Sequence, residues 1–322
     1  MKSIVISGTT FPKAVSAELQ ARGFEIVSIP GDLDEESVVE RLEGAWGYIL
    51  GGSETMTKGV WGTLSDLRLV CFLGTGFESF IELPTDRERI AFCYTPHANA
   101  EAVAEFTIAL MLDAVRGVCK RTMGVAGGVW SEESTPSLIG ASIGIIGMGH
   151  IGQSVARIAT AAFGSQIVYW NRSRKPELES LGYTRLDTPT DVCRSASIVS
   201  LHCAYVPGAN DALIGEAELQ ALGAGGVLVN TARAELVDPG SLAKALRSGG
   251  ISGAAFDGYY TEPTPLPTED VHGLLSLIPE SLLVTPHCAY LSEQAVLRMA
   301  EMAAANIVAV EAGQAPPFAI AS

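Results

Sequence analysis

The stretch SIGIIGMGHIG, residues 142–152, decides the fold of this chain. Its first five residues predict a buried strand, three glycines follow with GxGxxG spacing, and a helical pattern comes next. In that setting the first glycine permits a tight turn, the second lets the backbone approach a pyrophosphate, and the third allows helix and strand to pack closely. The helix N-terminus adds N–H donors. We therefore predict a dinucleotide site made by Gly147, Met148, Gly149, His150, Ile151 and Gly152.

The next predicted strand, Gln166–Trp170, ends in a basic turn. Asn171 stands where NAD-binding folds usually carry a carboxylate for the ribose hydroxyls. Losing that anion and gaining cations favours the 2′-phosphate of NADP, although a merely solvated basic turn would leave NAD as the cofactor. The residues predicted to bind the adenosine end are Asn171, Arg172, Ser173, Arg174 and Lys175.

Short apolar runs alternate with helical patterns on both sides of this motif. The predicted strands are Ser3–Ser7, Phe24–Ser28, Gly47–Leu50, Leu69–Leu73, Ser142–Ile146, Gln166–Trp170, Ile198–His202, Gly226–Asn230, Gly253–Phe256 and Leu282–Thr285. Such alternation implies parallel strands, because each right-handed crossover needs a helix to carry the chain back. The last predicted helix, Ser292–Ala312, has no sheet of its own and can pack on the first unit.

We therefore predict an α/β protein with two doubly wound parallel sheets. A Rossmann-type dinucleotide-binding domain, residues 97–291, is inserted into a smaller flavodoxin-like domain of residues 1–96 and 292–322. The helix predicted at Ala100–Arg116 is apolar over most of its surface, which is typical of a helix buried between domains or between two subunits.

Composition narrows the function. The 322 residues carry a net charge of −15, are 48% hydrophobic and have a mean hydropathy of +0.27. So acidic a surface disfavours nucleic acids and anionic membranes as partners. The six cysteines are dispersed without a CxxC pair, so neither a disulfide framework nor a metal site is predicted. With no signal-peptide pattern and no apolar run of about 18 residues, the protein is expected to be cytoplasmic.

Four charged or titratable residues follow strand ends in the second half of the chain. Arg233 comes after one predicted strand, Asp257 and Glu262 after the next, and His287 after the last. Each has an ordinary structural explanation when taken alone. Because the carboxyl ends of parallel strands open on one crevice, however, the group can converge as a cation, acids and a proton carrier.

These motifs together resemble the D-isomer-specific 2-hydroxyacid dehydrogenases, with glyoxylate/hydroxypyruvate reductases the most similar members. The resemblance runs from about Tyr48 onward through the stretches LGTGFESF, NAEAVAEFTIALML, GIIGMGHIG, VSLHCAYVP, VNTARAELVD, FDGYYTEP and TPHCAY. It implies hydride transfer between NADP(H), or NAD(H), and the carbonyl carbon of a small 2-oxo acid or its D-2-hydroxy acid.

The resemblance also implies site roles. His287 would exchange a proton with the substrate oxygen, Glu262 would hold its ring, and Arg233 would polarise the carbonyl and grip the carboxylate. Backbone N–H groups of Thr75 and Gly76 would bind the remaining carboxylate oxygen. Further cofactor contacts are expected from His202, Cys203, Ala204, Thr231, Ala232, Asp257, His287 and Ala289. A helix at Ala100–Arg116 would join two subunits in a homodimer.

Two other functions fit parts of the sequence. A nucleotide-sensing, corepressor-like regulator would use the same fold, but it would not need the Arg233, Glu262 and His287 set. A dehydrogenase of an unusual oxyanion or phosphonate would account for the atypical His97 and the pair Tyr259–Tyr260.

Overall fold

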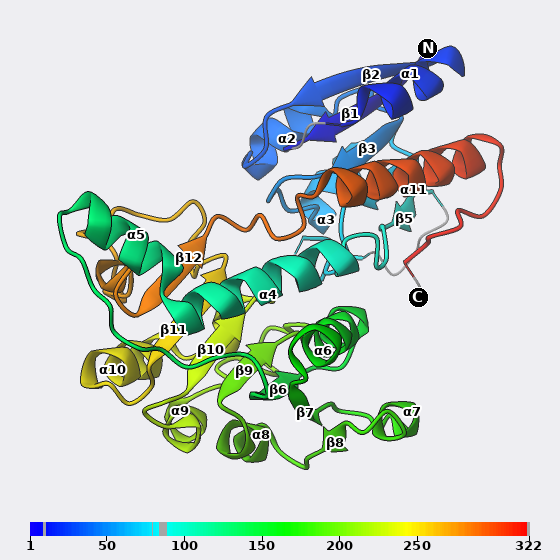
Figure 1. Cartoon of the computed structure of the whole chain (residues 1–322). Helices are drawn as coiled ribbons and strands as arrows, with labels where there is room; N and C mark the ends of the chain where they lie inside the picture. The colour runs from blue at the N-terminus through cyan, green and yellow to red at the C-terminus, as the bar shows by residue number, and fades with distance from the viewer. Residues whose placement is uncertain (9–10, 79, 84–88, 321–322) are drawn as a thin grey trace. The chain divides into compact units, whose positions relative to one another are not determined.

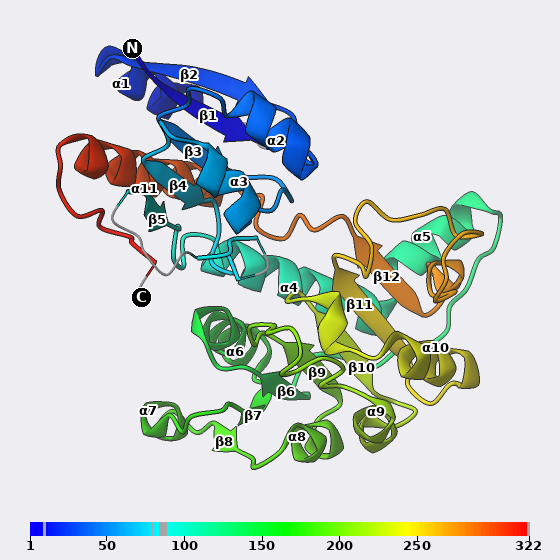
Figure 2. The same ribbon diagram turned by 180° about the vertical axis from the view of Figure 1, so that it is seen from behind.

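The structure is a computed structural model that describes residues 1–8, 11–78, 80–83 and 89–320. Position 79 of the LGTGFESF stretch and the last two positions of the expected 292–322 segment lie outside these residues. The chain divides into two compact units, unit 1 with Met1–Asn99 and Leu291–Ser322, and unit 2 with Ala100–Tyr290. Each is described by itself (Figures 1 and 2).

Unit 1 is built on a parallel sheet with the order β2-β1-β3-β4-β5 among its described residues. This is the flavodoxin-like order. Its helices cover both faces: α1 and α11 pack on one, where Leu19 and Ile307 are fully buried, and α2 and α3 pack on the other around Val38 and Val60. The strands are β1 Lys2–Ser7, β2 Phe24–Ile29, β3 Gly47–Leu50, β4 Leu69–Phe72 and β5 Ala91–Cys93, and the helices α1 Lys13–Ala21, α2 Glu35–Arg41, α3 Lys58–Thr63 and α11 Glu293–Glu311.

Unit 2 carries a parallel sheet with the order β12-β11-β10-β9-β6-β7-β8. Starting from β6, this is the Rossmann order with one further strand. The strands are β6 Ser142–Ile146, β7 Gln166–Trp170, β8 Thr184–Arg185, β9 Ile198–Leu201, β10 Val227–Asn230, β11 Gly253–Asp257 and β12 Leu282–Thr285. The predicted fold class is therefore confirmed, with two doubly wound parallel sheets.

The helices of unit 2 also form two layers (Figure 1). One core contains α4 and α6 residues, and the other contains residues of α8, α9 and α10. The helices are α4 Ala100–Arg116, α5 Val118–Ala126, α6 His150–Phe163, α7 Pro176–Glu179, α8 Pro189–Ser195, α9 Glu216–Leu222 and α10 Pro239–Ser248. Asp238 begins α10 by accepting a hydrogen bond from the Ser241 N–H, and Pro239 occupies the first turn.

The apolar surface of α4 is used inside unit 2. Ala104, Ile108, Met111 and Val115 lie in the same core as β6 and α6. Burial within one chain thus accounts for these apolar residues, and the expectation that a helix here joins two subunits stays a prediction. Within the described residues, no helix is both long enough and apolar enough to cross a bilayer.

Candidate active site

The glycine loop begins at the end of β6. Gly147 has φ +100°, and a side chain there would meet the His202–Cys203 backbone at 2.4–2.7 Å. A Cβ on Gly152 would lie 2.2 Å from the Gly147 carbonyl oxygen, so only glycine lets α6 start this close to the strand.

Gly149 differs from its two neighbours. A Cβ on it would meet no chain atom within 4 Å, and the residue is exposed at the start of α6. The space that this glycine leaves is therefore open to a ligand, beside the first N–H groups of a 14-residue helix. These features fit a dinucleotide pyrophosphate. His150 is exposed at the same place, whereas the Met148 side chain is fully buried.

The basic turn after β7 is tied to the glycine loop by Asn171. Its Oδ1 accepts a hydrogen bond from the Met148 N–H at 3.0 Å, and its Nδ2 donates to the Ser173 carbonyl oxygen at 2.9 Å. The Met148 N–H is therefore already used within the chain.

The three cations of this turn are not equivalent. Arg174 makes a two-bond ion pair with Glu179 at 2.8 and 2.7 Å, which lowers the pKa of Glu179 and raises that of Arg174. Lys175 Nζ lies 4.0 Å from a Glu177 oxygen. Arg172 is exposed and makes no ion pair within the described part of the chain. Of the three, Arg172 is the cation most directly available to a phosphate.

Arg233, Glu262 and His287 come together at the carboxyl ends of β10, β11 and β12. His287 Nδ1 lies 3.0 Å from Glu262 Oε2, and its Nε2 lies 3.3 Å from Arg233 Nη1. A guanidinium can only donate, so the neutral ring accepts at Nε2 and donates from Nδ1 to the carboxylate. The three residues lie in one unit, as the strand-end argument predicted.

Glu262 is held in its charged form. Burial alone would raise its pKa, but the hydrogen bond and charge of His287, the Tyr259 N–H at 2.9 Å and the charge of Arg233 lower it overall. Its carboxylate folds over Gly258, where φ is +106° and a Cβ would lie 2.5 Å from Oε1. The base that orients His287 is thus ionised and fixed at both oxygens.

Two buried polar residues hold this arrangement. Asn230 donates to the Arg233 carbonyl oxygen at 2.7 Å and accepts from the Ala232 N–H at 3.0 Å, which fixes the turn before the arginine. Asp257 accepts from Thr285 Oγ1 at 2.6 Å, and from the N–H groups of Cys288 at 2.9 Å and Ala289 at 2.8 Å.

Sequence reasoning missed Asn230, although an amide at the end of the apolar run VLVN is a visible signal. The family resemblance predicts that Asp257 contacts the cofactor. In the structure, the Asp257 carboxylate accepts three hydrogen bonds from the turn around His287. That turn is strained, since His287 has φ +51°.

The remaining cofactor candidates differ in exposure. Thr231 Oγ1 is hydrogen-bonded to Thr107 of α4 at 2.8 Å, and Ala289 is buried with its N–H on Asp257. Ala204 is exposed and Cys203 half-buried. The His202 side chain points inward to Ser200 Oγ at 2.8 Å, and desolvation lowers its pKa to about 3. His202 is therefore a neutral residue under the glycine loop.

In unit 1, the residues expected to bind the substrate carboxylate lie in the loop after β4. Thr75 Oγ1 accepts from the His97 N–H at 3.2 Å and lies 3.4 Å from Asn99 Oδ1. His97 has φ +62°, in the left-handed region that favours glycine. The loop that carries Thr75 and Gly76 is thus braced by the segment before α4.

Both atypical tyrosines are engaged within unit 2. Tyr259 is 6% exposed and donates to Asp270 Oδ2 at 2.8 Å, and Tyr260 donates to the Val237 carbonyl oxygen at 2.9 Å. Both pack in the core of unit 2, so they give no support to an unusual oxyanion or phosphonate substrate.

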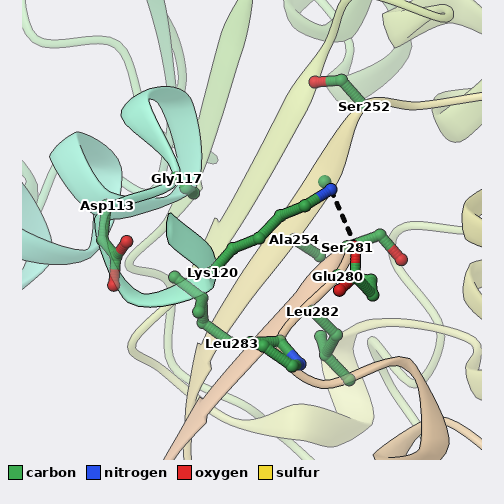
Figure 3. A pocket seen from close by; sticks show the side chains of 12 residues that line it. Asp113, Gly117, Lys120, Ser252, Ala254, Glu280, Ser281, Leu282 and Leu283 are labelled. Atoms are coloured by element: carbon green, nitrogen blue, oxygen red, sulfur yellow. Dashed lines mark ion pairs between the residues drawn. The ribbon is translucent and has the colours of Figure 1, made fainter. Parts of the chain in front are cut away.

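A small cavity lies in unit 2 at the amino ends of strands β11 and β12, whereas the Arg233, Glu262 and His287 side chains follow the carboxyl ends of the strands (Figure 3). It is lined by residues that include Asp113, Ser252 and Leu283, and Lys120 crosses it to pair with Glu280 at 2.8 Å. Its volume of about 40 Å³ holds a few waters and is far too small for a dinucleotide. The glycine loop and His287 instead follow the carboxyl ends of β6 and β12.

Comparisons with known proteins agree with this geometry. Residues 108–289 match the family described as "D-isomer specific 2-hydroxyacid dehydrogenase, NAD binding domain". The chain is 37% identical to a glyoxylate reductase of Aeropyrum pernix over 78% of its length and 75% of the relative, and 31% identical to one of Korarchaeum cryptofilum over 94% and 93%. The crystal structure of the TT0316 protein from Thermus thermophilus superposes with a TM-score of 0.88 and 32% identity, covering 99% of this chain and 100% of that one.

Proposed function

The chain belongs to the D-isomer specific 2-hydroxyacid dehydrogenase family, and from that membership we propose that it reduces a small 2-oxo acid with NADPH. The observation that carries the proposal is the group Arg233–His287–Glu262, with His287 Nδ1 3.0 Å from the carboxylate and Nε2 3.3 Å from the guanidinium. The named relatives support glyoxylate or a similarly small 2-oxo acid as substrate.

The residues divide the chemistry between them. When bound, the nicotinamide supplies the hydride that adds to the carbonyl carbon. His287, protonated at Nε2, gives that proton to the carbonyl oxygen, and Glu262 stabilises the imidazolium through Nδ1–H. Arg233 binds the substrate carboxylate by charge-assisted hydrogen bonds and draws electron density from the carbonyl. From the family resemblance we also propose that the Thr75 and Gly76 N–H groups of unit 1 bind a substrate carboxylate oxygen.

The preference for NADPH is part of the proposal. Asn171 carries no charge and its oxygen is engaged by Met148, so it offers no anionic acceptor to a ribose hydroxyl. Arg172 is exposed beside it and supplies a charge-assisted bond to a 2′-phosphate. Arg174 adds a second bond only by exchanging its carboxylate partner for the phosphate.

We also propose that the protein is a homodimer whose interface includes α5 and the segment that follows it, rather than α4 alone. Large apolar side chains are exposed on α5 and the segment that follows it, among them Trp130 at 78% and Ile139 at 77%. This segment is held in place, because Arg121 donates to the carbonyl oxygens of Ser131 at 3.1 Å and Glu133 at 2.7 Å. A fixed apolar surface of this kind is typical of an interface.

The test is an NADPH-oxidation screen over small 2-oxo acids, starting with glyoxylate, hydroxypyruvate and pyruvate. We expect turnover with at least one of them and much less in His287→Gln. Tight NADPH binding without turnover on any of them would instead support a nucleotide-sensing protein, and the enzyme proposal would fall.

A further inference from the structure

The segment between Glu262 and β12 contains one well-connected carboxylate. Asp270 accepts hydrogen bonds from the Leu275 N–H at 2.9 Å, the His272 N–H at 3.1 Å and the Tyr259 hydroxyl at 2.8 Å. The backbone bonds fix the carboxylate within its own loop. The bond to Tyr259 is different, since it joins this loop to the turn that follows β11.

Tyr259 is connected at both of its ends. Its hydroxyl is bound by Asp270, and its backbone N–H donates to Glu262 Oε1 at 2.9 Å. Its ring is packed edge-on against Tyr260, with centroids 5.3 Å apart. The side chain is only 6% exposed, so it is enclosed by its neighbours in the core of unit 2.

We propose that Asp270 is a positioning residue for the Glu262–His287 pair and acts through Tyr259. The carboxylate fixes the buried phenol, the phenol fixes the backbone of the turn, and the turn fixes the oxygen of Glu262 that does not face His287. Without the Asp270 bond the buried hydroxyl has to find a new acceptor, and the turn moves with it. The activity arms of the test rest on the proposed reductase function.

The electrostatic surroundings make Glu262 the partner that matters to His287. The ring also faces the cation of Arg233 at 3.3 Å and the Tyr290 ring at 6.5 Å, and Asp257 is reached through the Cys288 N–H. Glu262 is the anion in direct contact with the ring. A looser Glu262 therefore stabilises the imidazolium less, so the proton donor becomes a stronger acid and the ring is less often oriented for transfer.

The variants are Asp270→Ala, which removes the acceptor of the Tyr259 hydroxyl, Tyr259→Phe, which removes the donor, and the double change. We expect each single variant to lower kcat about tenfold, well inside the roughly 10²-fold cost of a misplacement near 1 Å. KM for the 2-oxo acid and for NADPH should stay close to wild type. The basic limb of the kcat profile should move to lower pH, and the double variant should show the same displacement as the singles because the two groups form one bond.

Tyr260→Phe is the matched control. It removes a phenol hydroxyl of the same kind from the same core. That hydroxyl donates to the Val237 carbonyl oxygen and, within the described residues, makes no hydrogen bond to Asp270 or Glu262. It should lower thermal stability much as Tyr259→Phe does while leaving the kcat pH profile in place.

A second measurement does not need turnover. In ¹⁵N-histidine spectra, His287 of the wild type should show a proton fixed on Nδ1, and the Asp270 and Tyr259 variants should show mixed tautomers. If the wild type has no reductase activity but the variants still differ from it in these spectra, the reductase function is rejected and the positioning role of Asp270 is kept. Unchanged spectra together with an unchanged pH profile in both single variants would overturn the positioning role itself.

Discussion

The side-chain oxygen of Asn171 lies 3.0 Å from the backbone nitrogen of Met148, so the residue after β7 holds the glycine loop after β6. The same side chain donates to the Ser173 carbonyl oxygen. One amide therefore fixes both the loop expected to bind the phosphates and the turn expected to select the cofactor. An aspartate there would keep the acceptor for Met148, lose the donor to Ser173 and place an anion in this turn.

This relationship leads to a prediction on cofactor choice. Asn171→Asp combined with Arg172→Ala should fold normally and lower the ratio of kcat/KM for NADPH to that for NADH. One charge-assisted bond is worth about 1.5–3 kcal/mol, so the ratio should fall by roughly tenfold to a hundredfold. Arg174→Ala is the comparison and should cost less, because Arg174 is paired with Glu179 in the free protein. A native enzyme that favours NADH would show that the turn is only a solvated surface.

A second prediction concerns proton transfer. His287→Ala should lower kcat by about two to four orders of magnitude, the usual contribution of a positioned acid–base group. Binding of NADPH, followed by fluorescence, should persist because the glycine loop is untouched. Glu262→Gln should give a smaller loss, since the ring remains and only its orienting anion is gone. Near-normal turnover in the alanine variant would remove His287 from the mechanism.

The third prediction compares alanine substitutions at two glycines of the loop. Gly152→Ala places a Cβ 2.2 Å from the Gly147 carbonyl oxygen and should destabilise unit 2 in thermal unfolding. Gly149→Ala meets no chain atom within 4 Å, so the protein should keep its melting temperature yet bind NADPH at least tenfold more weakly, by about 1.4 kcal/mol. Equal affinity in Gly149→Ala and wild type would mean that the pyrophosphate lies elsewhere.

The fourth prediction concerns acid stability. Burial lowers the pKa of His202 to about 3, and its Nδ1 is buried without a hydrogen-bond partner among the described residues. An unfolded histidine titrates near 6.5, so below that pH the unfolded state takes up a proton that the folded state does not. Between pH 7 and pH 5 this should cost about 2 kcal/mol of unfolding free energy.

Urea unfolding at pH 7 and pH 5 measures this loss of unfolding free energy. His202→Gln should lose most of that pH-dependent difference. Ser200→Ala keeps the buried ring and should retain the difference, even though it loses the 2.8 Å hydrogen bond. A wild type and a glutamine variant with the same pH dependence would show that this histidine is not responsible.

The fifth prediction is the oligomeric state. Light scattering at micromolar concentration should give a dimer. The exposed apolar residues of the proposed interface lie in residues 118–139 and include Met123 at 54% and Trp130 at 78%, so Met123→Glu with Trp130→Glu should shift the population towards monomer. Val271→Glu is the control, because it places the same charge on an apolar residue that is 88% exposed outside the 118–139 segment. A monomeric wild type would contradict the proposal.

Much of the fold was predictable because its signals are local. The glycine spacing, the β-branched strand before it and the helical period after it together define β6 and α6, and the bounds of α4 and β12 were predicted without error. Elements without such signals were missed. The strand β5 has three residues, and α5 lies among glycines that argue against a helix.

The candidate site likewise has features that the sequence predicts and features that it does not. Strand-end placement predicted that Arg233, Glu262 and His287 meet, because the topology alone brings them to one edge. The pairing of Arg174 with Glu179 and the burial of Tyr259 depend on rotamers and neighbours that the strand and helix patterns do not specify. No local pattern encodes those contacts, so the difference between Arg172 and Arg174 and the proposed role of Asp270 could not be predicted from the sequence.

The division of unit 1 affects how the protein is made. Its chain leaves at Asn99 and returns at Leu291, and α11 supplies Ala303 and Ile307 to the core on one sheet face. During synthesis from the amino end, unit 2 is complete while the part of that face formed by β4 and β5 still lacks its covering helix, because α1 is the only one of the two helices already made. Until α11 leaves the ribosome, the nascent chain therefore exposes an apolar sheet surface to chaperones and to other nascent chains. Truncation before Glu293 should give an aggregating product rather than a smaller enzyme.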